Sequence, residues 1–157
     1  MTDYEMLCGQ VREMILADPW YVPALSNVSA LLFDTLPGLN WVGFYLLRES
    51  RLVVGPFQGK PACVHIPAGK GVCGAAVEKD EIQNVPDVHQ FPGHIACDSA
   101  SNSEIVLPLH RDGRPAAVLD IDSTEFRRFS AEDEAGLAKI AEIIEKLVDW
   151  GSLFSAV

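Results

Sequence analysis

The chain has 157 residues, of which 48% are hydrophobic and 22% are charged, a balance typical of one soluble globular domain. Its formal net charge is −10 and its lysines and arginines are scattered, which excludes the basic surface of a nucleic-acid binder and disfavours anionic membranes. No apolar run approaches the roughly 20 residues that span a bilayer, and the acidic N-terminus lacks a signal-peptide pattern, so we expect a cytosolic protein.

Two helices are predicted before the first strand. Apolar residues recur at helical spacing over residues 3–16, and the pair Asp18-Pro19 ends this segment. The second segment covers residues 22–36, where Pro37-Gly38 stops it. A third helix is predicted at the other end of the chain, over residues 130–150, where Ser130 and Asp133 have the spacing of a capping box.

Between these helices the sequence predicts strands joined by tight turns. Residues 40–47 and 51–57 are rich in aromatic and aliphatic side chains and predict one hairpin, and residues 104–110 and 116–122 predict another. Helices at both ends with hairpin-linked strands between them indicate an α+β fold. We expect a central antiparallel sheet with the N- and C-terminal helices packed on one face.

Residues 58–103 are different, because glycine, proline, histidine and polar residues are frequent there. A short helix over residues 71–79 and a short strand over 81–85 are the regular elements that we expect in it. A long irregular stretch inside a compact domain is usually a functional loop. We therefore expect this segment to lie over the other face of the sheet and to roof a pocket.

Three of the four cysteines, Cys63, Cys73 and Cys97, fall in this segment beside glycine, proline, histidine or serine. We therefore expect all three on loops or at the ends of elements, where thiols indicate redox or metal chemistry. Three unpaired cytosolic cysteines are the alternative. The fourth, Cys8, lies on the apolar face of the first helix and is expected to pack in the core.

The surroundings of two of these thiols bear on their reactivity. A helix that starts before Cys73 would favour its thiolate through the helix dipole. Cys97 has His94 nearby, which favours a thiolate, and Asp98 beside it, which opposes one. Zinc binding is the rival use of this segment, with soft ligands available from Cys63, His65, Cys73, His89, His94 and Cys97. The short spacings of structural zinc sites are missing, which disfavours zinc.

Polar and aromatic residues alternate on the predicted strands. Asp120 and Asp122 share one strand face, and Glu104 opens the neighbouring strand. Buried carboxyl groups are costly unless they are used, and such a trio can bind an ammonium group or donate a proton. Solvated strand ends are the alternative for Glu104 and Asp122. Trp41 and Tyr45 also share one face and can wall a small pocket, although aromatic stripes are more often core.

Seven stretches combine these residues in a distinctive order: 40–45 (NWVGFY), 55–63 (GPFQGKPAC), 71–74 (GVCG), 85–89 (VPDVH), 91–101 (FPGHIACDSAS), 103–106 (SEIV) and 113–122 (GRPAAVLDID). Together they resemble the free methionine-(R)-sulfoxide reductases, which are single GAF-domain enzymes. The resemblance covers roughly residues 20–150. It implies that residues 1–157 form one GAF domain of α+β fold.

The resemblance also implies roles for the candidate residues. Cys97 would attack the sulfoxide sulfur, Cys63 would be the resolving cysteine, and Cys73 a second recycling thiol. Trp41 and Tyr45 would hold the substrate methyl group. Three acids, Glu104, Asp120 and Asp122, would hold the substrate amino group and polarise the S–O bond.

The implied reaction reduces free L-methionine (R)-sulfoxide to L-methionine by thiol chemistry. A sulfenic acid on the nucleophile condenses with a second cysteine to a disulfide, which thioredoxin would reduce. No metal or organic cofactor is expected, and a homodimer is plausible. The alternatives are a non-catalytic GAF sensor for a small ligand or metal, and a thiol switch without a dedicated substrate.

Overall fold

The computed structural model describes residues 1–151, so residues 152–157 of the predicted domain lie outside the described part. Within that part the elements, in chain order, are α1 (Tyr4–Ala17), α2 (Tyr21–Thr35), β1 (Leu39–Arg48), β2 (Arg51–Gly59), β3 (His65–Pro67), α3 (Gly71–Lys79), β4 (Gln83–Val85), the 3-10 helix η1 (Val88–Gln90), β5 (Ser103–Arg111), β6 (Arg114–Ser123) and α4 (Ala131–Leu147). Among residues 1–151 no helix combines the length and the apolar character needed to cross a membrane.

The strands of residues 1–151 form one antiparallel sheet in the order β3-β2-β1-β6-β5-β4. Both predicted hairpins are confirmed. Glu49 and Ser50 have φ values of +50° and +66°, and Asp112 and Gly113 have values of +53° and +76°. Positive φ at both central residues marks the two-residue turn whose twist matches that of the paired strands. The first and the last strands of the two hairpins, β1 and β6, pair at the centre of the sheet.

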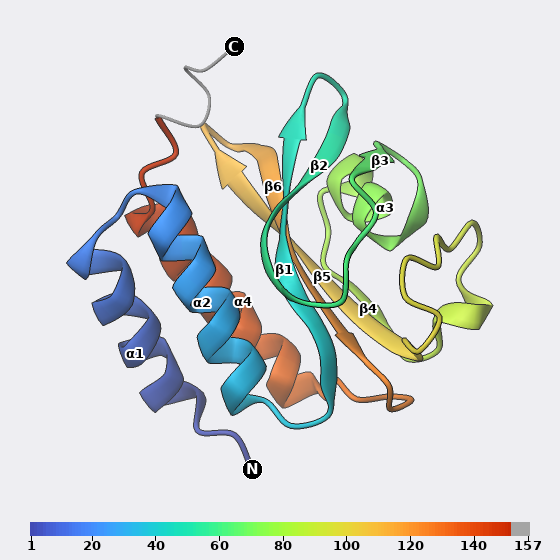
Figure 1. Ribbon diagram of the computed structural model, residues 1–157, viewed down its shortest axis with the longest axis horizontal. Coiled ribbons are helices and arrows are strands. Elements are labelled where there is room, and N and C mark those ends of the chain that lie inside the picture. Colours follow the sequence, from blue (N-terminus) through green and yellow to red (C-terminus); the bar gives the residue numbers. More distant parts are fainter. Residues whose placement is uncertain (152–157) are drawn as a thin grey trace.

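The N- and C-terminal helices cover one face of the sheet, as predicted (Figure 1). α2 packs against β1 and β2, α4 packs against β5, and α1 lies outside on α2 and α4. The core between them is apolar throughout, with Leu32, Phe44 and Leu119 fully buried. Cys8 is partly buried and packs against this core, so the prediction of a packing role for it is confirmed.

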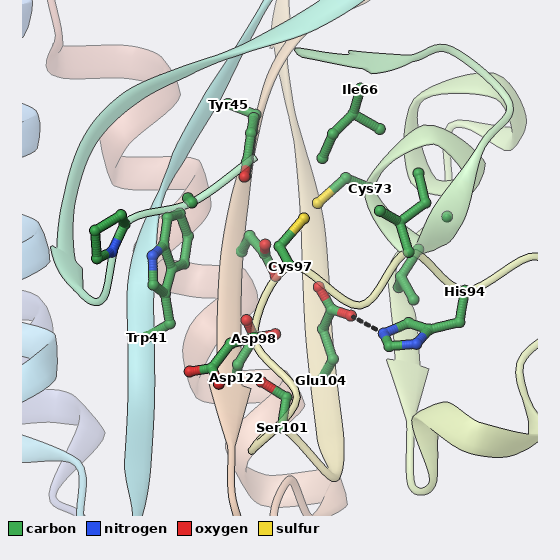
Figure 2. Close-up of a pocket in the computed structure, with 16 residues that line it drawn as sticks. Trp41, Tyr45, Ile66, Cys73, His94, Cys97, Asp98, Ser101, Glu104 and Asp122 are labelled. Atoms are coloured by element: carbon green, nitrogen blue, oxygen red, sulfur yellow. Dashed lines mark ion pairs between the residues drawn. The ribbon is translucent and has the colours of Figure 1, made fainter. Parts of the chain in front are cut away.

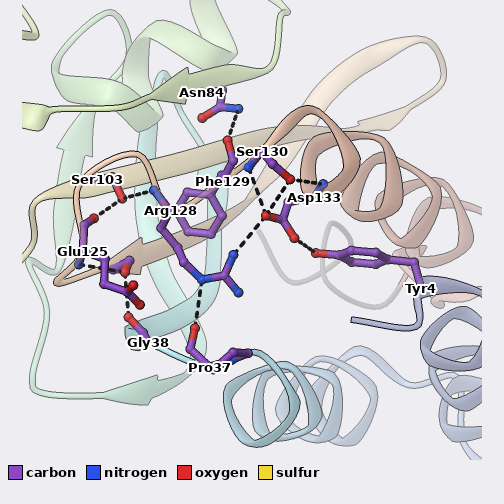
Figure 3. Close-up of polar contacts among 11 residues, drawn as sticks. Tyr4, Pro37, Gly38, Asn84, Ser103, Glu125, Arg128, Phe129, Ser130 and Asp133 are labelled. Atoms are coloured by element: carbon purple, nitrogen blue, oxygen red, sulfur yellow. Dashed lines mark hydrogen bonds and ion pairs between the residues drawn. The ribbon is translucent and has the colours of Figure 1, made fainter. Parts of the chain in front are cut away.

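Asp133 joins the start of α4 to the rest of the helical layer (Figure 3). It completes the predicted capping box with Ser130. The same carboxylate accepts hydrogen bonds from the Tyr4 hydroxyl at 2.6 Å and from the Arg128 guanidinium at 3.0 Å. Arg128 also donates to the carbonyl of Pro37 at 2.9 Å. This network fixes the loop that returns the chain from the sheet to α4.

The segment between β2 and β5 covers the opposite face of the sheet, with α3 packed across it (Figure 1). The sequence analysis missed β3, which pairs with β2 through Leu52 opposite Ile66. It is only three residues long and ends in proline, so no alternation marks it. β4 is also shorter than predicted. The second apolar cluster lies under this segment and includes Val72, Val106 and Val118.

One histidine links three elements and predicts a pH-dependent stability. The imidazole of His110 on β5 lies 2.5 Å from Asp80 at the end of α3 and 2.5 Å from Glu145 on α4. Burial disfavours the charged imidazole, but the hydrogen bonds to both carboxylates outweigh it and raise the pKa of His110. The stabilisation is therefore complete below about pH 6.5 and is lost as the pH rises through the raised pKa.

We expect wild-type protein to lose on the order of 1 kcal/mol of unfolding free energy relative to His110→Asn as the pH rises above neutrality. Urea denaturation over a pH series measures this difference. His65→Asn, on an exposed position of β3, is the matched control and should follow the wild-type profile. Parallel profiles for wild type and His110→Asn would show that the contacts of His110 with Asp80 and Glu145 contribute nothing to the free energy of unfolding.

Candidate functional site

Cross-strand register gathers the candidate side chains on the sheet face under α3. Trp41 pairs with Asp122, which pairs with Glu104, so these three residues form one row across β1, β6 and β5. Gly43 pairs with Asp120 in the next row that faces the same side. Directly paired residues point to the same face of a sheet. The predicted alternation is therefore confirmed, and the pairing of β1 with β6 brings the aromatic and acidic residues together.

These rows form the floor of a pocket whose space free of atoms is about 530 Å³ with its open mouth included. Segment 61–73 and segment 94–101 supply its walls and roof. Figure 2 shows the aromatic side chains on one side of it, His94 on the other, and the sulfur atoms of Cys73 and Cys97 above the acids. Within residues 1–151, no lysine or arginine lines this pocket.

Trp41 and Tyr45 form a stacked aromatic wall. Their rings lie 5.7 Å apart, and Trp41 also stacks on Phe57 at 5.1 Å. Gly43 makes this possible, because a Cβ there would lie 2.8 Å from the Trp41 ring and 2.3 Å from Cβ of Phe57. The Tyr45 hydroxyl donates to the Cys63 carbonyl at 3.0 Å. The wall therefore also holds the segment that carries Cys63.

A disulfide joins Cys63 to Cys97. Both residues lie in loops, as predicted, and Cys97 lines the pocket. Cys73 and Cys8 are the free thiols. The two loops that roof the pocket are thus linked covalently over the acids.

Cys73 lies at the end of an element, as predicted, but the expectation of a favoured thiolate there is wrong. It lies in the first turn of α3 but is only 4% exposed, and it faces the carboxyl group of Asp120. Burial raises its pKa well above the usual value, and the charges of Asp120 and Glu104 raise it further. These effects exceed that of the helix dipole, so the thiol stays protonated beside Asp120.

The acid trio, which we define as Glu104, Asp120 and Asp122, has two buried members, Glu104 and Asp120, and one partly buried member, Asp122. Glu104 is 7% exposed and Asp120 5%, and Oδ1 of each aspartate is buried without a hydrogen-bond partner. The alternative of solvated strand ends is therefore wrong. Burial raises the pKa of all three carboxyl groups. The charge of Asp120 raises the pKa values of Glu104 and Asp122 further. Hydrogen bonds from its neighbours oppose the rise at Asp120, so its pKa is raised less than those of Glu104 and Asp122 and it is the most readily ionised of the three.

A raised carboxyl pKa destabilises the folded protein at neutral pH. The folded state binds more protons than the unfolded state, so stability falls as the pH rises above about 4.3, the usual value for glutamate. We expect Glu104→Gln to raise the melting temperature at pH 7 by about 2–4 °C and to lose this advantage below pH 4. Calorimetry at both pH values measures this difference. Glu13→Gln, on an exposed site of α1, should change neither value.

The soft ligands considered for zinc are only partly brought together. Cys63, Cys73, Cys97 and His94 lie in or beside the pocket, whereas His65 and His89 are exposed elsewhere. His94 Nε2 lies 4.0 Å from Glu104. Burial and the charge of His89 lower its pKa, so the imidazole at the pocket wall is neutral. The zinc set suggested by sequence is therefore not assembled.

Asn40 is a positioning residue that the sequence analysis missed. Its side-chain amide donates to Asp98 and to Ser101, each at 2.9 Å. Asp98 also accepts from the Ala100 backbone N–H at 2.9 Å, and these bonds lower its pKa. Its carboxylate is thus held within its own loop. The sequence signal available was a polar residue at the start of an apolar strand, beside the aromatic wall.

The fold and the pocket define the class of protein first. The GAF domain family matches residues 25–149 of this chain. Residues 1–151 form a six-stranded antiparallel sheet with helices, and the chain gives a TM-score of 0.89 at 40% identity with a solved GAF domain, over 93% of this chain and 87% of that one. The α+β GAF fold expected from the sequence is therefore confirmed.

Close relatives then define the family. The free methionine-R-sulfoxide reductase of Escherichia coli K12 is 54% identical, over 98% of this chain and 95% of the relative. The Saccharomyces cerevisiae protein of the same name is 46% identical, over 80% and 74%. The free methionine-R-sulfoxide reductase of Neisseria meningitidis, solved with its substrate, gives a TM-score of 0.91 at 40% identity, over 100% and 96%. The chain belongs to the free methionine-R-sulfoxide reductase family, as its motifs predicted.

Proposed function

We propose that this chain reduces free L-methionine (R)-sulfoxide to L-methionine, with Cys97 as the nucleophile. The observation that carries the proposal is the position of Cys97, which lines the pocket of aromatic and acidic residues and is joined to Cys63. A nucleophile that must also form a disulfide has to reach both the substrate and a second thiol. Proteins of this name, one of them solved with its substrate, support the assignment.

The reaction proceeds by two displacements at sulfur. The Cys97 thiolate attacks the sulfoxide sulfur while the sulfoxide oxygen takes up one proton. The S–O bond and the new sulfur–sulfur bond then break as the protonated oxygen passes to the Cys97 sulfur, so methionine leaves and Cys97 becomes a sulfenic acid. The Cys63 thiolate then attacks the Cys97 sulfur, a disulfide forms, and water leaves. The sulfoxide has gained two electrons and the two thiols have lost them. Reduction of the disulfide by a dithiol restores the enzyme.

The acid trio has two tasks in this proposal. Asp120, as the charged member, binds the substrate ammonium group, which fits a pocket without lysine or arginine in the described chain. Glu104 or Asp122, held protonated by burial, donates to the sulfoxide oxygen and makes the sulfur more electrophilic. Trp41 and Tyr45 contact the substrate methyl group. A residue within a polypeptide lacks the ammonium group, so the free amino acid is preferred.

Recycling and assembly complete the proposal. Thioredoxin is the reductant, and Cys73 serves as a second recycling thiol only when the disulfide rearranges. The cytosol is the compartment where such a dithiol is kept reduced.

Residues 1–157 act as one GAF domain, supported by the match over residues 25–149. Apolar side chains exposed on α1 and α2, namely Met6, Leu16 and Phe33, support a homodimer. Light scattering of the purified protein tests the dimer.

A thioredoxin-coupled assay with the separated R and S epimers of free methionine sulfoxide tests the function. We expect turnover of the R epimer and at least about a hundredfold lower kcat/KM for the S epimer, because a fixed acid and a fixed thiol approach only one face of the sulfur. Equal turnover of both epimers would indicate a thiol that reacts without a shaped site. Absence of turnover with either epimer would favour a sensor.

The hydrogen bond from Tyr45 to the Cys63 carbonyl predicts a selective defect. Tyr45→Phe keeps the aromatic wall but removes a contribution of about 1 kcal/mol to the position of the Cys63 segment. We expect the Cys63–Cys97 disulfide to form several-fold more slowly, with the first methionine formed at the wild-type rate. Rapid quench followed by thiol alkylation separates the two steps. Tyr21→Phe, on α2, is the matched control, and equal slowing of both steps would contradict the prediction.

A further inference from the structure

The floor of the pocket also holds three side chains whose atoms could bind a metal ion. The proposed substrate contacts do not explain why these three converge. Sγ of Cys73 and one carboxylate oxygen each of Glu104 and Asp120 lie within 4.8 Å of one another. They come from α3, β5 and β6, so three separate elements converge on one point. Figure 2 shows Cys73 and Glu104 directed toward the same space beside Cys97.

A second observation favours cation binding at this place. Asp120 lines the pocket and is 5% exposed, and its Oδ1 atom is buried with no hydrogen-bond partner within residues 1–151. Oδ1 of Asp122 is in the same condition. Buried carboxylate oxygens are normally paired, coordinated to a metal or neutralised. No lysine or arginine of the described chain lines the pocket to fill that need.

We propose that Cys73, Glu104 and Asp120 form a binding site for a borderline divalent cation such as Zn²⁺, with Asp122 or water as the fourth ligand. One thiolate with two carboxylates suits Zn²⁺ or Co²⁺, whereas Mg²⁺ and Ca²⁺ prefer oxygen ligands alone. A metal in tetrahedral geometry places such donor atoms about 3.3–3.7 Å apart, so they need to approach by roughly 1 Å. Rotation of the side chains supplies that movement.

The ion and the substrate ammonium group use the same acids, so the two exclude each other. Inhibition of sulfoxide reduction by Zn²⁺ therefore rests on the proposed function, whereas binding of the metal does not. The site persists when Cys63 and Cys97 are joined, because Cys73 stays free in that state. The oxidised protein thus isolates the assigned ligands from the other two thiols of the pocket.

The test is Co²⁺ binding to oxidised protein carrying Cys8→Ser, which leaves Cys73 as the free thiol. We expect one Co²⁺ per chain by equilibrium dialysis, with near-ultraviolet sulfur-to-cobalt charge-transfer absorption that excess Mg²⁺ does not remove. Adding Cys73→Ser should abolish that absorption and weaken binding at least about tenfold. Asp120→Asn should weaken binding similarly, whereas Asp98→Asn, whose carboxylate is held by Asn40, should not.

Absence of bound Co²⁺, or charge-transfer absorption that survives Cys73→Ser, would overturn the proposal. If the variants fail to fold, titration of the Cys8→Ser protein with Zn²⁺ against bound Co²⁺ decides instead. Displacement with loss of the absorption supports the site, and binding without the absorption rejects the thiol ligand. None of these readouts needs turnover, so a protein that binds Co²⁺ but reduces no sulfoxide would refute only the proposed function.

Discussion

Replacement of Cys97 by serine is expected to abolish methionine formation, with a loss on the order of 10⁴-fold or more. The pocket places this sulfur over the acid trio, and a serine hydroxyl is far too weak a nucleophile to replace it. Reduced protein mixed with excess substrate and no reductant should give one methionine per chain for wild type and none for Cys97→Ser. Chromatography of the quenched mixture counts the product.

The matched comparison is Cys63→Ser, which removes the other half of the disulfide. It should still give one methionine per chain, leave a sulfenic acid on Cys97 that dimedone traps, and slow thioredoxin-coupled turnover at least about tenfold. Cys8→Ser, in the helical layer, should behave as wild type. If Cys63→Ser gave no methionine and Cys97→Ser gave one, the two roles would have to be exchanged.

The two hairpins and the faces of their strands could be predicted from sequence because both depend on local pattern. Alternation placed Asp120 and Asp122 on one face of their strand. It placed Trp41 and Tyr45 on one face of another strand in the same way. Their meeting depends on the pairing of β1 with β6, whose residues are far apart along the chain. Residue alternation carries no information about which strands become neighbours, so the site was predicted as parts and not as a pocket.

Cys73 shows why the thiol environments were misread. The nearby glycines suggested a loop or the end of an element, and Cys73 does lie at the start of α3, but a Cβ on Gly74 would lie 2.8 Å from the Pro67 carbonyl oxygen. The glycine therefore permits close packing of α3 and does not mark exposure. Asn40 was missed for a related reason, because its partners Asp98 and Ser101 reach it only through the roof of the pocket. Long-range contacts of this kind leave no periodic signal.

Replacement of Asp120 by asparagine should remove the recognition of the free amino group. We expect kcat/KM for free methionine (R)-sulfoxide to fall by on the order of 100- to 1000-fold, because an ionic hydrogen bond in a buried site is lost. N-acetylmethionine sulfoxide carries no ammonium group, so its low wild-type rate should change little. Steady-state kinetics gives the ratio of kcat/KM for the free sulfoxide to kcat/KM for the N-acetylated one. This ratio should be large for wild type and near one for Asp120→Asn.

That ratio separates ammonium binding from the other tasks of the acid trio. Glu104→Gln removes a proton donor but leaves the charge on Asp120, so it should lower kcat for both substrates and preserve their ratio. Asp98→Asn, which changes a carboxylate held by Asn40 and Ala100, should preserve the ratio as well. Equal losses on both substrates with Asp120→Asn would place the ammonium group elsewhere. The specificity for a free amino acid would then have to come from the roof of the pocket, segments 61–73 and 94–101, which leaves no room for a longer chain.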